Sequence, residues 1–128
     1  MEKTQKQPHI LLVEDDPFLS DIYKKKFEME GFKVSLARDG EKAVNDANKK
    51  SPDLILLDVL LPKLDGFAVL EKLKSDKKTK NIPVVLLTNF GQKEDVEKGM
   101  KAGAVEYLIK THFKPSEIVD KIKKVLKL

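Results

Sequence analysis

The sequence of 128 residues contains no cysteine, no tryptophan and only two histidines. Without cysteine the chain can form neither disulfides nor thiolate metal sites, and two histidines argue against a histidine-rich one. No apolar run approaches the roughly 20 residues that a membrane helix needs. The first eight residues are polar and do not resemble a secretory signal peptide. These absences predict a cytoplasmic protein without a membrane segment.

Charged residues, by contrast, are abundant. They make up 36% of the chain against 41% hydrophobic residues, and the net charge is +4. This composition suits one globular domain with a strongly charged surface. The lysines alternate with acidic residues in every predicted helix, which is typical of solvated helix faces. We therefore do not expect direct binding to nucleic acids or to a membrane.

Short aliphatic segments alternate with longer amphipathic ones along the chain. Strands are predicted at residues 9–13, 32–36, 53–57, 82–88 and 104–109. Near-continuous apolar runs are typical of strands buried on both faces, whereas 32–36 alternates and is expected at a sheet edge. A helix with a 3.6-residue period follows each strand. The order predicts an α/β fold, a flavodoxin-like doubly wound (βα)5 arrangement with a five-stranded parallel sheet in the order 2-1-3-4-5 and helices on both faces.

Two of the predicted helices carry specific expectations. In the first, Leu19, Tyr23 and Phe27 recur every four residues, and Asp16 can cap the amino end. In the fourth, only Val96 and Met100 are expected to face inward, which would leave this helix weakly anchored and easy to move.

Residues with functional groups follow four of the five predicted strands, and parallel strands place their carboxyl ends at one edge of the sheet. They are Glu14, Asp15 and Asp16 after the first strand, Asp58 after the third, Thr88 after the fourth and Lys110 after the fifth. A cluster of carboxylates needs a cation, and an all-oxygen site favours Mg²⁺ with room for a phosphate. A metal, a lysine and a hydroxyl around one carboxylate indicate phosphoryl transfer to that group, with Asp58 as the nucleophile.

With these motifs the sequence resembles the receiver domain of bacterial response regulators, of the single-domain, chemotaxis-regulator-like kind. The resemblance is carried by LLVEDD, DLILLDVLLPKLDG, PVVLLT, KAGAVEYLIK and the last amphipathic segment. It makes residues 1–8 a polar leader and residues 9–128 the receiver domain. It implies that Asp58 accepts a phosphoryl group from a sensor histidine kinase, a phosphotransfer protein or a small acyl phosphate. Glu14, Asp15, Asp58 and the backbone carbonyl of Leu60 would hold Mg²⁺.

The resemblance also implies a conformational switch. The Thr88 hydroxyl would move toward the phosphoryl oxygens, Tyr107 would turn inward, and Lys110 would pair with the added charge. The surface of the fourth helix, fifth strand and fifth helix would then repack and act on a downstream effector protein. Such a protein is a phospho-acceptor rather than an enzyme, catalysing only its own phosphorylation and dephosphorylation. Homodimerisation through the fourth and fifth helices stays open.

Two features depart from, or qualify, this family pattern. Many members have a cis Lys-Pro bond where this chain has Lys110-Thr111, and a cis bond before threonine would cost ~3 kcal/mol, so a trans bond is expected. Leu60 and Phe90 would flank the phosphoryl group with apolar side chains. The hypothesis is that they hinder an attacking water and lengthen the phosphoryl lifetime.

Three alternative functions stay open at this point. A metal-dependent phosphohydrolase with an aspartyl-phosphate intermediate would usually carry a second aspartate at the position of Leu60. A flavin binder of the same fold would need a phosphate-binding loop, whereas the segment VEDDP would repel a phosphate. An interaction module that works without phosphorylation would not need the complete acidic set.

Overall fold

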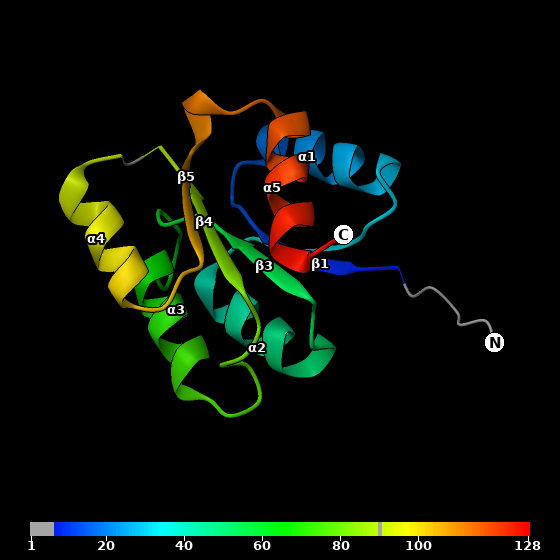
Figure 1. Cartoon of the computed structure of the whole chain (residues 1–128). Coiled ribbons are helices and arrows are strands. Elements are labelled where there is room, and N and C mark those ends of the chain that lie inside the picture. Colours follow the sequence, from blue (N-terminus) through cyan, green and yellow to red (C-terminus); the bar gives the residue numbers. More distant parts are fainter. Residues whose placement is uncertain (1–6, 90) are drawn as a thin grey trace.

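The computed structural model describes residues 7–89 and 91–128, so most of the predicted leader, as well as Phe90, lies outside the described residues (Figure 1). The described part contains one sheet with the strand order β2-β1-β3-β4-β5, and every neighbouring pair is parallel. The strands are β1 (His9–Val13), β2 (Lys33–Ala37), β3 (Leu54–Leu57), β4 (Val84–Thr88) and β5 (Glu106–Ile109). The predicted fold class and strand order are confirmed, and the strand ends differ from the prediction by at most two residues.

Helices cover both faces of this sheet (Figure 1). They are α1 (Pro17–Met29), α2 (Gly40–Lys50), α3 (Gly66–Ser75), α4 (Lys93–Lys101) and α5 (Pro115–Leu126). Buried side chains of α1 and α5 pack on one face, and those of α2 and α3 pack on the other. A short 3-10 turn, Lys110–His112, leads from β5 toward α5.

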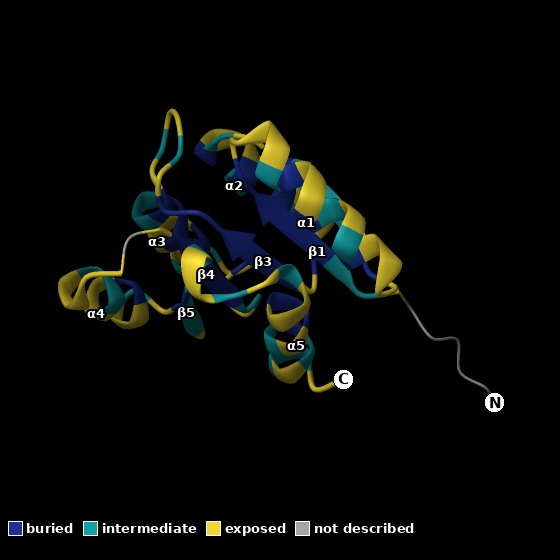
Figure 2. Ribbon diagram, turned by 90° about the horizontal axis from the view of Figure 1, so that it is seen from above, coloured by how far each residue is buried: buried dark blue, intermediate teal, exposed yellow. Residues whose placement is uncertain are grey.

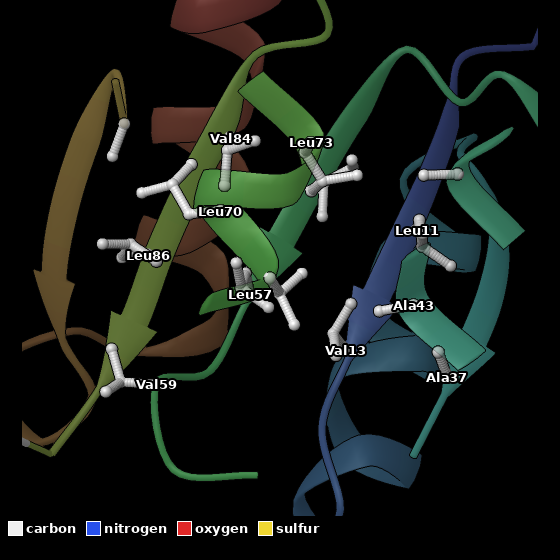
Figure 3. Packing of buried hydrophobic residues seen from close by; sticks show 14 residues of the cluster. Leu11, Val13, Ala37, Ala43, Leu57, Val59, Leu70, Leu73, Val84 and Leu86 are labelled. Carbon is white, nitrogen blue, oxygen red and sulfur yellow. The ribbon is translucent and has the colours of Figure 1, made fainter. Parts of the chain in front are cut away.

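Two apolar clusters fill the space between the sheet and its helices. Along β1, Ile10 and Leu12 point to the α1/α5 face, while Leu11 and Val13 point to the α2/α3 face (Figure 3). All residues of β3 are buried, as Figure 2 shows for the centre of the sheet. In β2 only Ala37 is buried, which confirms the prediction of an edge strand. The neighbouring central strands β1 and β3 end at the same level, because their last residues, Val13 and Leu57, are paired.

The helices confirm one packing prediction and correct another. Tyr23 and Phe27 of α1 are buried, and their rings stack with centroids 6.0 Å apart. In α4, Met100 is 44% exposed, so the prediction that it faces inward is wrong. Gly99 is the buried residue of this helix, and Val96 is half-buried. Successive residues are turned by about 100° around a helix, so burying Gly99 directs Met100 outward.

The remaining backbone expectations can be checked directly. Within the described residues no peptide bond is cis, so the predicted trans Lys110–Thr111 bond is confirmed. Asp16 lies at the amino end of α1, where its side chain accepts hydrogen bonds from the amides of Phe18 and Leu19. None of the described helices has the length and apolar character that crossing a membrane would require.

Candidate functional site

Strand register brings the predicted site residues to one place. Val13 of β1 lies beside Leu57 of β3, and the amide of Asp58 donates to the Val13 carbonyl at 3.1 Å. Glu14 and Asp58 consequently leave neighbouring strands at the same level. A pocket of about 230 Å³ at this edge is lined by Glu14, Asp15, Asp16, Leu19, Asp58, Leu60, Thr88, Asn89 and Lys110.

Lys110 joins the two buried carboxylates of this pocket. Its Nζ lies 2.7 Å from Glu14 Oε1 and 2.8 Å from Asp58 Oδ2. The side chains of Lys110, Glu14 and Asp58 are only 9%, 3% and 7% exposed. The sequence assigned Lys110 to an incoming negative charge, whereas the structure shows that it already neutralises part of the acidic cluster. Because these groups are shielded from water, the charge of each is compensated by the opposite charge of its neighbours.

Burial and pairing change the proton affinities of these groups. Burial raises the pKa of Glu14 above its ordinary value, and the hydrogen bond from Lys110 only partly opposes this shift. Burial alone would lower the pKa of Lys110, but its hydrogen bonds to Asp58 and Glu14 outweigh that effect and the pKa is raised. Lys110 therefore stays positively charged at neutral pH.

Three carboxylates of the pocket could hold a metal ion together. One oxygen from each of Glu14, Asp15 and Asp58 lies within 4.8 Å of the other two. Glu14 and Asp58 are buried and Asp15 is exposed, so the group opens to solvent on one side. A set of hard oxygen donors with an open side fits Mg²⁺, which keeps several of its waters. Leu60 also lines this pocket, and its amide donates to Asp58 Oδ1 at 3.2 Å.

Asp16 has a different place in the structure from the acidic pair before it. Its carboxylate caps α1 at 2.9 Å from the Phe18 amide, while its own amide donates to Glu14 Oε2 at 3.2 Å. The metal-competent group does not include it. Asp16 thus orders the loop in which Glu14 and Asp15 lie.

The two predicted switch residues lie on neighbouring strands. Thr88 is buried at the carboxyl end of β4 and lines the pocket. Tyr107 of β5 is half-buried and packs against the cluster on the α2/α3 face. Burial, with smaller contributions from the carboxylates of Asp95 and Asp58, raises the pKa of Tyr107 to about 12. The Tyr107 hydroxyl therefore keeps its proton at neutral pH. Tyr107 is not among the residues that line the pocket with Thr88.

Sequence reasoning assigned no role to Gly66. Gly66 is buried at the start of α3, and its amide donates to the Val59 carbonyl at 2.7 Å. A Cβ at this position would lie 2.5 Å from Val59 Cα and would also meet the backbone carbonyl of Asp58. Because Gly66 has no side chain, α3 can begin in close contact with the backbone of Asp58 and Val59.

Replacing Gly66 with alanine is expected to destabilise the protein by about 1–3 kcal/mol, because the new methyl group must push backbone atoms apart. Urea denaturation of the metal-free protein measures the loss. Ser75→Ala at the other, exposed end of α3 is the control and should have little effect. A Gly66→Ala variant as stable as the wild-type protein would show that the backbone around Asp58 yields easily.

Comparisons with known proteins agree with this geometry. A family model described as "Response regulator receiver domain" matches residues 10–123. The DNA-binding dual master transcriptional regulator RpaA of Synechocystis sp. is 42% identical over 94% of this chain and 49% of its own length. The receiver domain of the Francisella response regulator 1452 has a TM-score of 0.86 at 32% identity, covering 94% of this chain and 97% of that one.

One further structure bears on the metal. The receiver domain of sensor histidine kinase PA1611 from Pseudomonas aeruginosa was solved with a magnesium ion coordinated in the active-site cleft. It has a TM-score of 0.85 and 31% identity, and the match covers 93% of this chain and 97% of that domain. The curated relatives are longer, and this chain spans about half of their length.

Proposed function

The chain belongs to the response regulator receiver family of two-component systems, and from this we propose that it is a phospho-acceptor switch in which Asp58 receives the phosphoryl group. One observation carries the proposal. The Asp58 carboxylate is buried, lies 2.8 Å from an ammonium group and shares a 4.8 Å cluster of oxygens with Glu14 and Asp15. No other described group forms such a metal-competent cluster.

The proposed reaction transfers a phosphoryl group from a phosphohistidine or a small acyl phosphate. A carboxylate oxygen of Asp58 forms the new bond to phosphorus as the bond to the donor's nitrogen or oxygen breaks, and the donor leaves with those electrons. Lys110 holds the Asp58 side chain and balances charge, while the Thr88 hydroxyl donates to a phosphoryl oxygen. Mg²⁺ held by Glu14, Asp15, Asp58 and the Leu60 carbonyl would neutralise charge on the phosphoryl oxygens.

Phosphorylation would change the surface formed by α4, β5 and α5. Thr88 lies in the pocket and Tyr107 lies beyond it on β5, so a shift of Thr88 toward the phosphoryl group would leave space for the tyrosine ring. Helix α4 buries Gly99 and only half-buries Val96. Because so little of α4 is packed against the rest of the protein, moving this helix requires little free energy. A sensor histidine kinase or phosphotransfer protein upstream, a downstream effector and a cytoplasmic location belong to the proposal.

A direct experiment tests the function. We expect the protein, incubated with Mg²⁺ and a small acyl phosphate, to gain one phosphoryl group that is stable in acid and labile in base. Intact-mass spectrometry measures the gain, which a chelator should abolish. Steady release of phosphate from external phosphate esters would instead identify a phosphohydrolase, and absence of any adduct would favour an interaction module. The proposed effect of Leu60 and Phe90 on the lifetime of the adduct stays a prediction.

Magnesium affinity is expected to fall with decreasing pH. Protons and the metal compete for the Glu14 carboxylate, and its raised pKa makes the proton an effective competitor already above the ordinary value of 4.5. The dissociation constant for Mg²⁺, measured by calorimetric titration from pH 8 downward, should rise as the pH falls through that raised pKa. In Glu14→Gln the affinity should be weaker, and this part of the pH dependence should be lost. A dissociation constant that stays level down to pH 4.5 would contradict the prediction.

A further inference from the structure

The loop between β3 and α3 contains a backbone conformation that most residues avoid. At its tip, the Leu64 amide donates to the Pro62 carbonyl at 2.7 Å, and the residue between them, Lys63, has φ 68°. This three-residue turn with positive φ has the hydrogen bond of a γ-turn, a rare and strained arrangement. Strained residues persist only where their surroundings hold them in place.

The start of α2 supplies that support. The Gly40 amide donates to the same Pro62 carbonyl at 3.3 Å, so this oxygen accepts two hydrogen bonds. A Cβ on Gly40 would lie 2.6 Å from Leu64 Cβ and 2.8 Å from the Leu64 carbonyl carbon. Only glycine therefore permits this approach of α2 to the turn. Lys63 Nζ also lies 3.9 Å from Asp39 Oδ2, a surface contact of small energetic value.

These contacts fix the loop on both sides of Leu60. On one side, the Val59 carbonyl accepts a hydrogen bond from the Gly66 amide at 2.7 Å. On the other side, the Pro62 carbonyl is held by Gly40 and by the turn at Lys63. Only Leu60 and Leu61 lie between these two anchored carbonyls, so the direction of the Leu60 carbonyl depends on both anchors.

We propose that Gly40 and Lys63 are positioning residues of the magnesium site, because together they hold the β3–α3 loop so that the Leu60 carbonyl is directed at the metal. The inference rests on the proposed function, in which that carbonyl is a metal ligand. Neither residue lines the pocket, and both act through the backbone of Pro62.

Two substitutions of Lys63 separate its backbone conformation from its charge. Its side chain is 60% exposed, so neither Lys63→Gly nor Lys63→Val removes buried packing, and both remove the same charge. Glycine adopts positive φ readily, whereas a β-branched residue does so only as an outlier. We expect Lys63→Gly to bind Mg²⁺ like the wild-type protein and Lys63→Val to bind about tenfold more weakly, the size of effect typical of residues that orient metal ligands.

Gly40→Ala should weaken Mg²⁺ binding to a similar extent. Gly31→Ala is its control, because Gly31 has φ 94° and no neighbouring atom within 4 Å of an added Cβ. That variant is strained without touching the loop, so it should lose stability but keep its Mg²⁺ affinity. Amide hydrogen exchange at Leu64 gives a second readout, and protection there should fall in Lys63→Val and not in Lys63→Gly.

The outcomes distinguish this inference from the function on which it rests. Equal Mg²⁺ affinities of Lys63→Gly and Lys63→Val, with Lys63→Val folded, would overturn the positioning role while leaving the metal site intact. A wild-type protein without measurable Mg²⁺ affinity would overturn the proposed metal site and the inference with it. Weaker Mg²⁺ binding in Lys63→Val and Gly40→Ala, with the Mg²⁺ affinities of Lys63→Gly and Gly31→Ala unchanged, supports the inference.

Discussion

Asp58→Asn is expected to abolish phosphorylation by a small acyl phosphate, with a loss of at least about 1000-fold in the labelling rate, since removing a nucleophile costs several orders of magnitude. Asparagine has nearly the same shape as aspartate. Its side-chain oxygen can still accept the hydrogen bond that the Leu60 amide donates to Asp58 Oδ1 at 3.2 Å. Its amide group is, however, a poor nucleophile toward phosphorus. Time courses of intact mass with Mg²⁺ present measure the effect.

Asp21→Asn is the matched control for this variant. Asp21 is an exposed aspartate of α1 whose partner is the surface residue Lys25. It should be phosphorylated like the wild-type protein. Persistent labelling of Asp58→Asn would show that another carboxylate, such as Asp15, accepts the phosphoryl group and would contradict the proposed role of Asp58.

Lys110→Met is expected to lower the free energy of unfolding by about 3–5 kcal/mol in the absence of metal, as removing one partner of a buried ionic group does. The substitution leaves the buried carboxylates of Glu14 and Asp58 without the ammonium group that lies 2.7 and 2.8 Å from them. Urea denaturation with a chelator present measures the loss. Mg²⁺ should restore part of it, because it stabilises the folded state that binds it.

The control is Lys24→Met, which removes an exposed ion pair with Glu28 at 2.9 Å and should cost less than about 1 kcal/mol. If both lysine variants lost the same small amount of stability, the buried cluster would not depend on Lys110. Acidic pH should also reduce the penalty in Lys110→Met, because protonated Glu14, whose pKa is raised, no longer needs a cation.

The contact of Lys110 with Glu14 and Asp58 should also make the stability of the protein depend on pH in the alkaline range. The pKa of Lys110 is raised in the folded state by its hydrogen bonds to Asp58 and Glu14, against the effect of burial. Its contribution to stability is therefore complete below the ordinary value of 10.5 and is lost as the pH rises through the folded-state pKa. The free energy of unfolding of the wild-type protein should therefore decrease at high pH by the contribution of Lys110, whereas Lys110→Met should not show this decrease.

Much of the fold and of the candidate site could be predicted because the relevant signals are local. An apolar run such as residues 54–57 indicates a strand buried on both faces, and the residue after it marks the carboxyl edge of a parallel sheet. Asp58, Thr88 and Lys110 were found this way, and the structure places all three at one pocket with Glu14 and Asp15. The edge position of β2 followed from its alternating pattern.

Local sequence patterns thus specify the strands and helices, their order along the chain and the functional groups at the sheet edge, since each of these depends on neighbours within a few residues. The packing of distant segments sets the rotation of α4 that buries Gly99 instead of Met100, and it brings Lys110 to both Glu14 and Asp58. The same packing sets the close approach of Gly40 to the turn at Lys63. These features join segments far apart in the chain, and they are set by how closely packed backbones and side chains fit in space.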